Sequence, residues 1–174
     1  CAEVCRQVFS VKDVSIVDST IPTTVAAVAA SVDLGRTLVI VSSKSGTTIE
    51  LQALLDFFHA RCTPMFDRPG QRFIAITDPG TPLEQIAYER GFRSLWLAPT
   101  DVGGRFSALS VFGILPMELM AIDSVAVWTS ARRMAASCAA GTSTPDNPGT
   151  RLGAALFNAY EAGRDKVTFV CSPS

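Results

Sequence analysis

The sequence has no excess of charge of either sign and only one histidine. Its 15 Lys and Arg residues are matched by 16 Asp and Glu residues, and a net charge of −1 provides no electrostatic footprint for nucleic acid. No window contains 18 apolar residues free of charge, which argues against a membrane span. The single histidine, His59, and the cysteines, which have no CxxC spacing, form no metal-site signature. We therefore expect no nucleic-acid partner, no membrane partner and no metal or other cofactor.

Several enzyme motifs are also missing. The sequence contains no GxGxxG, GxxxxGK[ST], HExxH or GxSxG, so it lacks the usual signatures of dinucleotide enzymes, P-loop NTPases, zincins and α/β-hydrolases. Five cysteines are an odd number, which favours reduced thiols and a cytoplasmic location. The sequence begins with Cys rather than Met and shows no signal peptide. We expect a fragment of a longer protein, truncated at both ends.

The sequence does contain a regular alternation of strand and helix patterns. Its 174 residues, 48% of them hydrophobic, suit a single domain with a substantial core over 1–174. The expected strands are 14–17, 37–41, 72–76, 95–97 and 167–171, and the expected helices are 2–9, 23–32, 49–61, 83–90, 106–122, with a kink at Pro116, 125–138 and 150–162. This order predicts an α/β fold, a doubly wound parallel sheet in a three-layer α/β/α sandwich.

The most informative stretch runs from a strand into a helix. Residues 38–41 (LVIV) are apolar without alternation, as in a strand buried on both faces of a parallel sheet. Residues 42–48 then supply five hydroxyl groups, Lys44 and Gly46 where a helix begins. Backbone N–H groups and the positive end of the helix dipole point into such a turn, which therefore suits a small anion such as phosphate. The alternative is an ordinary capping box of Thr47 and Glu50, which leaves four hydroxyl groups unexplained.

A second loop follows a later strand and contains a Gly-Gly-Arg sequence. Gly103 and Gly104 allow the backbone to approach a ligand closely, and Arg105 is suited to place its guanidinium over a developing oxyanion. The alternative for Arg105 is a surface residue that packs on the protein or pairs with an acid such as Asp101.

Two further polar residues are expected to have structural roles. His59 lies one turn after Asp56 on the charged side of its helix, so we expect a solvated residue. Asp78 stands before Pro and Gly, which is typical of an aspartate that forms a turn.

Two segments, SSKSGTTIE at 42–50 and DVGGRFSALSVFG at 101–113, resemble the glucose-6-phosphate isomerase family. The first resembles the phosphate loop of sugar isomerase (SIS) domains, and the second resembles the family's GGR signature. Between them, ITDPGTPLEQIAYERGFR at 76–93 is similar to the matching segment of these enzymes, notably the isomerase half of transaldolase–isomerase fusions. The resemblance covers nearly the whole chain and implies an N-terminal, Rossmann-like SIS domain.

The resemblance also implies roles for individual residues. The sugar phosphate would be held by Ser43, Lys44, Ser45 and Thr48. Arg105 and the Gly104 amide would face the reacting carbons, and Glu50 matches a family acid close to the site. In that family a glutamate moves a proton between C1 and C2 through a cis-enediol and a histidine assists ring opening, and neither matches a residue here. The full-length enzyme would be a homodimer acting on a phosphosugar in glycolysis and gluconeogenesis.

Two other functions remain open on the sequence. A regulatory SIS domain would sense a phosphosugar, although such a sensor needs no cation over an enediolate. Another aldose–ketose isomerase of phosphosugars would share the Ser- and Thr-rich loop but not GGRFSALS.

Overall fold

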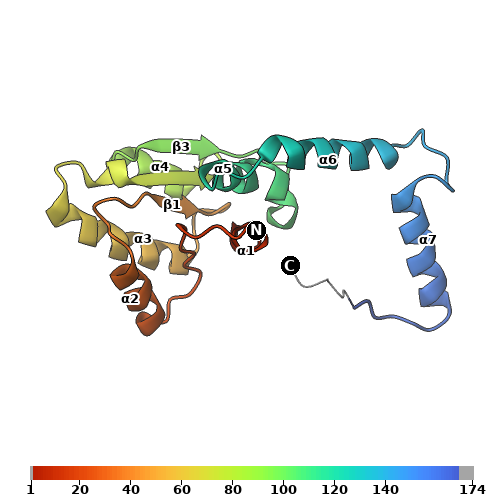
Figure 1. Ribbon diagram of the computed structural model, residues 1–174, viewed down its shortest axis with the longest axis horizontal. Coiled ribbons are helices and arrows are strands. Elements are labelled where there is room, and N and C mark those ends of the chain that lie inside the picture. Colours follow the sequence, from red (N-terminus) through yellow and green to blue (C-terminus); the bar gives the residue numbers. More distant parts are fainter. Residues whose placement is uncertain (1, 169–174) are drawn as a thin grey trace. The chain divides into compact units, whose positions relative to one another are not determined.

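The computed structural model describes residues 2–168 (Figure 1). Contacts between Cα atoms divide the chain into two compact units, Cys1–Ile122 and Asp123–Ser174, and each is described by itself. The expectation of a single domain over 1–174 stays a prediction.

The centre of the first unit is a three-stranded parallel sheet in the order β1-β2-β3. The strands are β1 (Val39–Ser42), β2 (Phe73–Thr77) and β3 (Ser94–Leu97). Val39 pairs with Phe73, and Ile74 pairs with Ser94. All five residues of β2 are buried, as its uninterrupted apolar sequence predicts for a central parallel strand. Together with the helices, the sheet confirms the expected α/β class.

One face of the sheet carries the main hydrophobic core. Helices α2 (Pro22–Ser31), α3 (Ile49–Cys62) and α4 (Pro82–Glu89) supply its apolar side chains. Phe73 and Leu83 are fully buried there and Leu55 is 2% exposed. Burying a side chain of this size stabilises the fold by about 1.5–3 kcal/mol. These contacts hold the helices that follow β1 and β2 firmly against the sheet.

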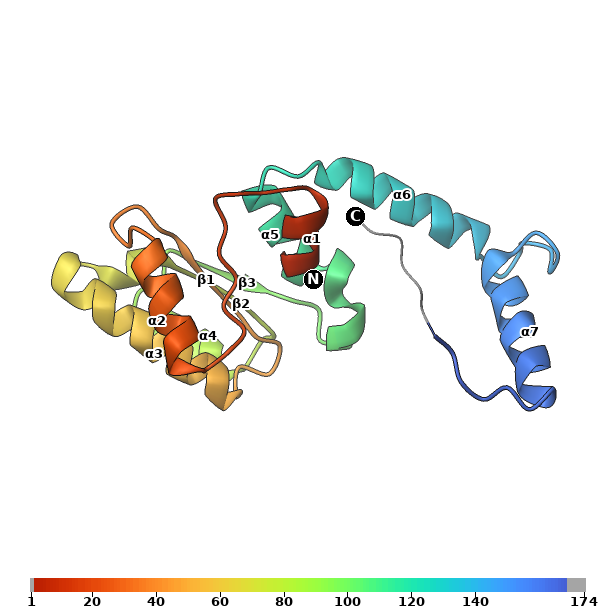
Figure 2. The ribbon, with the colours of Figure 1, turned by 60° about the horizontal axis from the view of Figure 1, so that its bottom comes forward.

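The other face of the sheet is also covered. Ile74 and Ile76 alternate with Phe73 and Ala75 along β2, so they point to the opposite side, and both are buried. Helix α5 (Val111–Leu119) contacts β2 and also contacts α1 (Ala2–Val8). Figure 2 shows α2 and α3 on one side of the strands and α1 and α5 on the other. Helices on both faces agree with the layered fold expected from the sequence.

Two expectations of secondary structure are wrong. Residues 14–17 form no strand, because within residues 2–168 no neighbouring strand pairs with them, and a strand needs a ladder partner as well as β-branched residues. The single helix expected over 106–122 is divided into the 3₁₀ helix η3 (Gly104–Leu109) and α5. Ser110 has an extended backbone between them, and its Oγ accepts a hydrogen bond of 3.3 Å from Phe112 N at the start of α5.

The described part of the second unit, residues 123–168, contains two helices, each with a clear N-cap. Helix α6 (Ser124–Ser137) begins after Asp123, whose Oδ1 accepts from Ala126 N at 2.9 Å. Helix α7 (Pro148–Glu161) begins after the buried Asn147, whose Oδ1 accepts from Thr150 N at 3.0 Å. Of the strand expected over 167–171, the first two residues are not in a strand and 169–171 lie outside the described residues.

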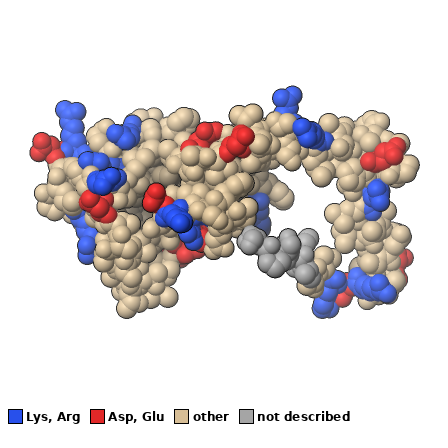
Figure 3. Space-filling model, in the orientation of Figure 1, with Lys and Arg blue, Asp and Glu red and all other residues tan. Residues whose placement is uncertain are grey.

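Two kinds of feature are absent from residues 2–168. No helix in this range is long and apolar enough to cross a membrane. No group of three or more His, Cys, Asp and Glu residues in the same range is placed to hold a metal ion. Figure 3 shows acidic and basic side chains interspersed on the face that it draws.

Candidate functional site

Three loops meet at the carboxyl edge of the parallel sheet. The first follows β1 at 43–48, the second follows β2 at 78–81, and the third follows β3 at 98–103. Backbone bonds continue the sheet into these loops: Ser43 N donates to Ile76 O at 3.0 Å and Ala98 N donates to Thr77 O at 2.9 Å. In parallel α/β sheets this edge is where ligands bind.

The first loop gathers its hydroxyl groups around a tight turn. Ser43 Oγ accepts from Gly46 N at 3.1 Å and lies 3.4 Å from Thr48 Oγ1. Ser45 Oγ accepts from Thr47 Oγ1 at 3.0 Å. The hydroxyl-bearing residues Ser45, Thr47 and Thr48 are exposed to solvent. The turn therefore presents hydroxyl groups to solvent at the point where α3 begins.

The capping box considered for this turn does not form. The N-cap of α3 is Thr48 rather than Thr47, and its side chain makes no capping hydrogen bond. Glu50 is exposed and makes no side-chain hydrogen bond within residues 2–168. The first N–H groups of α3 consequently have no capping side chain, and the positive end of the helix dipole faces the turn. A helix start of this kind can accept an anion.

Gly46 fixes the turn against the second loop. Its φ of +64° is left-handed, a region that favours glycine. A Cβ on Gly46 would lie 2.9 Å from Leu83 N and 2.9 Å from Thr81 Cβ. Thr81 Oγ1 in turn lies 2.7 Å from Thr77 Oγ1. The hydroxyl-rich turn is therefore packed directly on the start of α4.

Lys44 connects all three loops. Its Nζ donates to Asp78 Oδ2 at 2.5 Å and to Pro99 O at 3.4 Å. The side chains of Lys44 and Asp78 are 27% and 16% exposed, so the ion pair is partly buried. Asp78 Oδ1 is buried without a hydrogen-bond partner in the described part of the chain. Asp78 thus has a charge partner in addition to the turn-forming role expected of it.

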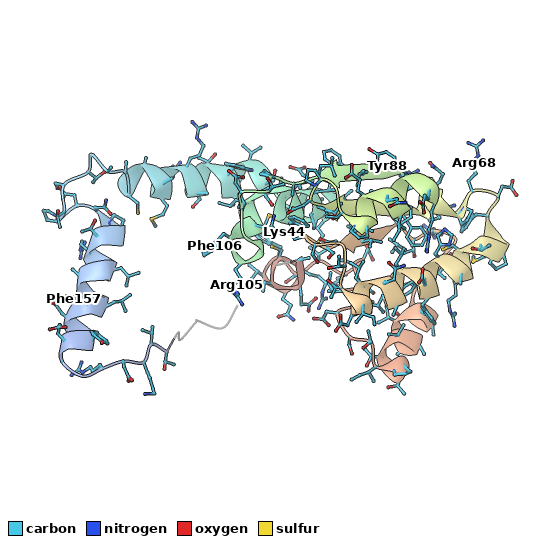
Figure 4. The ribbon with its side chains drawn as sticks, turned by 180° about the vertical axis from the view of Figure 1, so that it is seen from behind. Lys44, Arg68, Tyr88, Arg105, Phe106 and Phe157 are labelled. Atoms are coloured by element: carbon cyan, nitrogen blue, oxygen red, sulfur yellow. The ribbon has the colours of Figure 1, made fainter. Side chains whose placement is uncertain are left out.

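The Gly-Gly-Arg segment approaches the same place. A Cβ on Gly104 would lie 3.9 Å from Lys44 Cδ, so the first loop is in contact with the start of η3 (Gly104–Leu109). Arg105 is exposed on η3 and forms no ion pair with Asp101 or another acid within residues 2–168. Figure 4 shows Arg105 and Phe106 projecting from η3. The structure therefore brings Ser43, Thr48, Lys44 and Gly104 together, and leaves Arg105 and Glu50 without partners among the described side chains.

His59 differs from the solvated residue expected from the sequence. It is half-buried, its ring centroid lies 5.4 Å from that of Phe73, and its Nε2 is buried without a hydrogen-bond partner in the described range. Burial, and then the positive charge of Arg90, lower its pKa below the ordinary value of 6.5, while Asp56 opposes the shift. The neighbouring Asp56 Oδ1 accepts from Arg90 at 2.7 Å. His59 lies on the core side of α3 and not at the carboxyl edge of the sheet.

The Lys44–Asp78 pair was not expected from the sequence. The sequence suggests a separate role for each residue, a phosphate ligand for Lys44 and a turn former for Asp78. The sequence does contain a pattern that predicts the pair. Lys44 and Asp78 carry opposite charges just beyond the ends of adjacent parallel strands, and such positions lie at one edge of a sheet.

Comparisons with known proteins point to one group of enzymes. A glucose-6-phosphate isomerase from Synechococcus sp. (strain JA-3-3Ab) is 40% identical over 106 residues, which are 58% of this chain and 19% of that protein. The same enzyme from Heliobacterium modesticaldum is 34% identical over 135 residues, 75% of this chain and 29% of that protein. The chain thus spans less than a third of the length of these curated relatives. No family model matches it.

Two solved structures also align with this chain. A hypothetical protein from Thermus thermophilus aligns with a TM-score of 0.76 and 28% identity, covering 83% of this chain and 34% of that one. A glucose-6-phosphate isomerase from Chlamydia trachomatis aligns with a TM-score of 0.50 and 34% identity, covering 55% of this chain and 18% of that one. The alignments support the α/β fold, and the more specific likeness to SIS domains and transaldolase fusions stays a prediction.

Proposed function

We propose that this chain, which is homologous to one segment of the glucose-6-phosphate isomerases, forms the phosphate-binding part of an enzyme that interconverts glucose 6-phosphate and fructose 6-phosphate. The proposal combines homology over a fraction of those enzymes with the geometry of the hydroxyl-rich turn. We also propose that the enzyme is cytoplasmic and that the full-length protein is a homodimer.

The observation that carries the proposal is the uncapped start of α3. Thr48 is the N-cap without a side-chain capping bond, and the hydroxyl groups of Ser43 and Thr48 lie 3.4 Å apart beside it. A phosphate in this position would receive N–H donors, hydroxyl donors and the favourable end of the helix dipole together. A turn with a purely structural role would satisfy the helix with its own side chains, as Asn147 does for α7.

Within this site, we assign different roles to Lys44 and Arg105. The ammonium of Lys44 is held by Asp78 and Pro99 O, which favours a role in positioning the three loops alongside its long-range attraction for a phosphate. Arg105 has no acidic partner among the described residues, and its guanidinium is free to approach a substrate with the Gly104 amide. In the isomerase reaction an enediolate gathers negative charge on oxygen, and a fixed cation would stabilise it. Glu50, exposed in the first turn of α3, is the acid nearest in sequence to the phosphate turn.

Phosphate binding is the first test, and it can be made on the 174-residue chain itself. Titration of ¹⁵N-labelled protein with fructose 6-phosphate is expected to shift the amide signals of 45–49 before others. Thr48→Ala removes a hydroxyl donor, and losing a hydrogen bond to a charged ligand costs about 1.5–3 kcal/mol, so the Kd should rise at least about tenfold. Ser130→Ala, an exposed serine of α6, is the matched control and should bind as the unchanged chain does. Chemical-shift changes confined to residues outside 45–49, or equal affinities of the Thr48→Ala and Ser130→Ala variants, would refute the proposed site.

Catalysis is tested in a full-length protein that contains this segment. We expect the 174-residue chain alone to bind the sugar phosphate without turnover in a coupled assay, since the matched segments are only 19% and 29% of its relatives. In the full-length protein, Arg105→Ala should lower kcat by about 10²–10³, because an enediolate carries charge that the bound sugar lacks. Thr48→Ala should raise KM instead, because phosphate contacts are made equally before and during the reaction. If Arg105→Ala changes only KM, Arg105 is another phosphate ligand.

A further inference from the structure

An open hollow of about 410 Å³ lies at the edge of the sheet opposite the hydroxyl-rich turn. It is formed where β2 and β3 begin, and it is lined by Phe66, Asp67, Arg68, Gln71, Arg72 and Arg93. Figure 4 shows Arg68 at the far end of the sheet from Lys44. Because β2 is five residues long, the two edges are separated by about 16 Å at a rise of about 3.3 Å per residue.

The hollow is positively charged although the whole chain is not. Its lining contains three guanidinium groups and one carboxylate, a formal charge of +2 in a chain of net charge −1. Within residues 2–168, none of the three guanidinium groups forms an ion pair with an acid. Other arginines of the same unit do find acids, since Arg6 pairs with Glu3 and Arg90 pairs with Asp56. The hollow thus gathers three arginines whose charge is not neutralised by a described acid.

The backbone that carries these arginines is held in place by the packing of two loops. The short 3₁₀ helix η2 (Pro69–Arg72) lies against the turn after α4, where a Cβ on Gly70 would come within 1.8 Å of Arg90 O. Gln71 Nε2 donates to Gly91 O at 2.9 Å across the same contact. Arg93 N donates to Phe73 O at 2.9 Å, which fixes the start of β3 beside β2. A rigid frame of this kind reduces the entropy lost when a ligand binds.

Only one of the three arginine side chains is held by an aromatic contact in the described range. The Arg72 guanidinium lies 4.1 Å from the centre of the Phe66 ring, a cation–π contact that orients it toward the hollow's wall. Arg68 and Arg93 have no comparable aromatic contact in the described range. Two cations without such a contact, beside one that is held, would suit a ligand that presents several oxyanion groups.

We propose that this hollow binds a small polyanion with two or more negative charges, at a site separate from the sugar-phosphate turn. Guanidinium groups bind phosphate and carboxylate oxygens in a bidentate manner, so pyrophosphate and citrate represent the two chemistries that would fit. A volume of about 410 Å³ is within the range of small-molecule sites.

The test is an NMR titration of the ¹⁵N-labelled 174-residue chain with pyrophosphate and, separately, with citrate, at fixed ionic strength. The amides of 71–73 and of Arg93 should shift with a saturable Kd, apart from any shifts at 45–49. Arg93→Gln and Arg68→Gln should each weaken binding at the hollow about tenfold, because each removes a charge-assisted hydrogen bond. Arg151→Gln, an exposed arginine of α7, is the matched control and should leave the Kd unchanged.

Comparing pyrophosphate with citrate distinguishes a phosphate ligand from a carboxylate ligand. Tighter binding of pyrophosphate would identify a phosphate site, and tighter binding of citrate a carboxylate site; either supports the proposal. Shifts confined to 45–49 would overturn it, since the polyanion would then occupy only the hydroxyl-rich turn. Equal weakening by Arg93→Gln and Arg151→Gln would also overturn it, because net charge alone would explain the binding.

Discussion

Replacing Lys44 by methionine should destabilise the chain through the acid that it leaves behind. The ammonium of Lys44 is 2.5 Å from Asp78 Oδ2, and the other oxygen of that carboxylate is buried without a hydrogen-bond partner in the described range. Lys44→Met keeps most of the side-chain volume but removes the charge that compensates the aspartate. The hydrogen bond to Pro99 O, which connects the third loop, is lost at the same time.

The size of this effect follows from the exposure of the pair. Exposed ion pairs contribute about 0–1 kcal/mol, whereas removing one partner of a fully buried pair costs about 3–5 kcal/mol. At 27% and 16% exposure the pair lies between these limits, so Lys44→Met should cost about 2 kcal/mol. Asp78→Asn should cost less, about 1 kcal/mol, because the ammonium that it leaves unpaired belongs to Lys44, the more exposed partner at 27% against 16%. The double variant should be less destabilised than the sum by about 1 kcal/mol or more.

Urea unfolding of the four proteins measures this coupling directly. Lys166→Met is the matched control, because Lys166 also contacts an aspartate, at 2.9 Å, but with side chains 88% and 67% exposed, and no measurable change is expected. If the effects of Lys44→Met and Asp78→Asn simply add, the pair does not hold the loops together. A loss for Lys166→Met equal to that for Lys44→Met would refute the reasoning from burial.

Two further predictions concern the rest of the chain. His59 has a lowered pKa in the folded state, so the unfolded state binds the proton more tightly and the free energy of unfolding should fall as the pH drops below the ordinary value of 6.5. His59→Gln should flatten this pH dependence in urea unfolding; an unchanged slope would contradict it, since the chain has no other histidine. Asn147→Ala should cost about 1–2 kcal/mol, because the side chain caps α7 and its Nδ2 donates to Ala139 O at 3.3 Å. Circular dichroism during unfolding measures it, with the exposed Asn158→Ala on the same helix expected to be neutral, and equal losses would argue against the cap.

The sequence predicted those parts of the fold that depend on local pattern. The apolar runs that became β1 and β2 were identified because strands buried on both faces need no alternation. Residues 14–17 have a similar composition but form no strand, since a ladder partner is a tertiary property that composition does not contain. The break at Ser110 was missed for a related reason: its side chain caps α5, which a continuous apolar pattern conceals.

The candidate site was predictable to a similar degree. The position of the hydroxyl-rich turn followed from the order of strand and helix. The choice between a capping box and an open helix start required coordinates, because it depends on whether Thr47 or Thr48 is the N-cap. The partners of Lys44 come from two other loops, 34 and 55 residues further along the chain, and no local pattern connects them.

The close packing of Gly46 changes how sequence variation at this site should be understood. With a left-handed φ and a Cβ position 2.9 Å from atoms of the next loop, any other residue at position 46 would strain the fold whether or not a sugar phosphate ever binds. Its retention across evolution would therefore say nothing about ligand recognition. Thr48, exposed and without a capping bond, has no such structural constraint. A library selected only for soluble expression should let position 48 drift freely while position 46 stays glycine, and any constraint on position 48 that appears in a living cell would measure selection for the ligand.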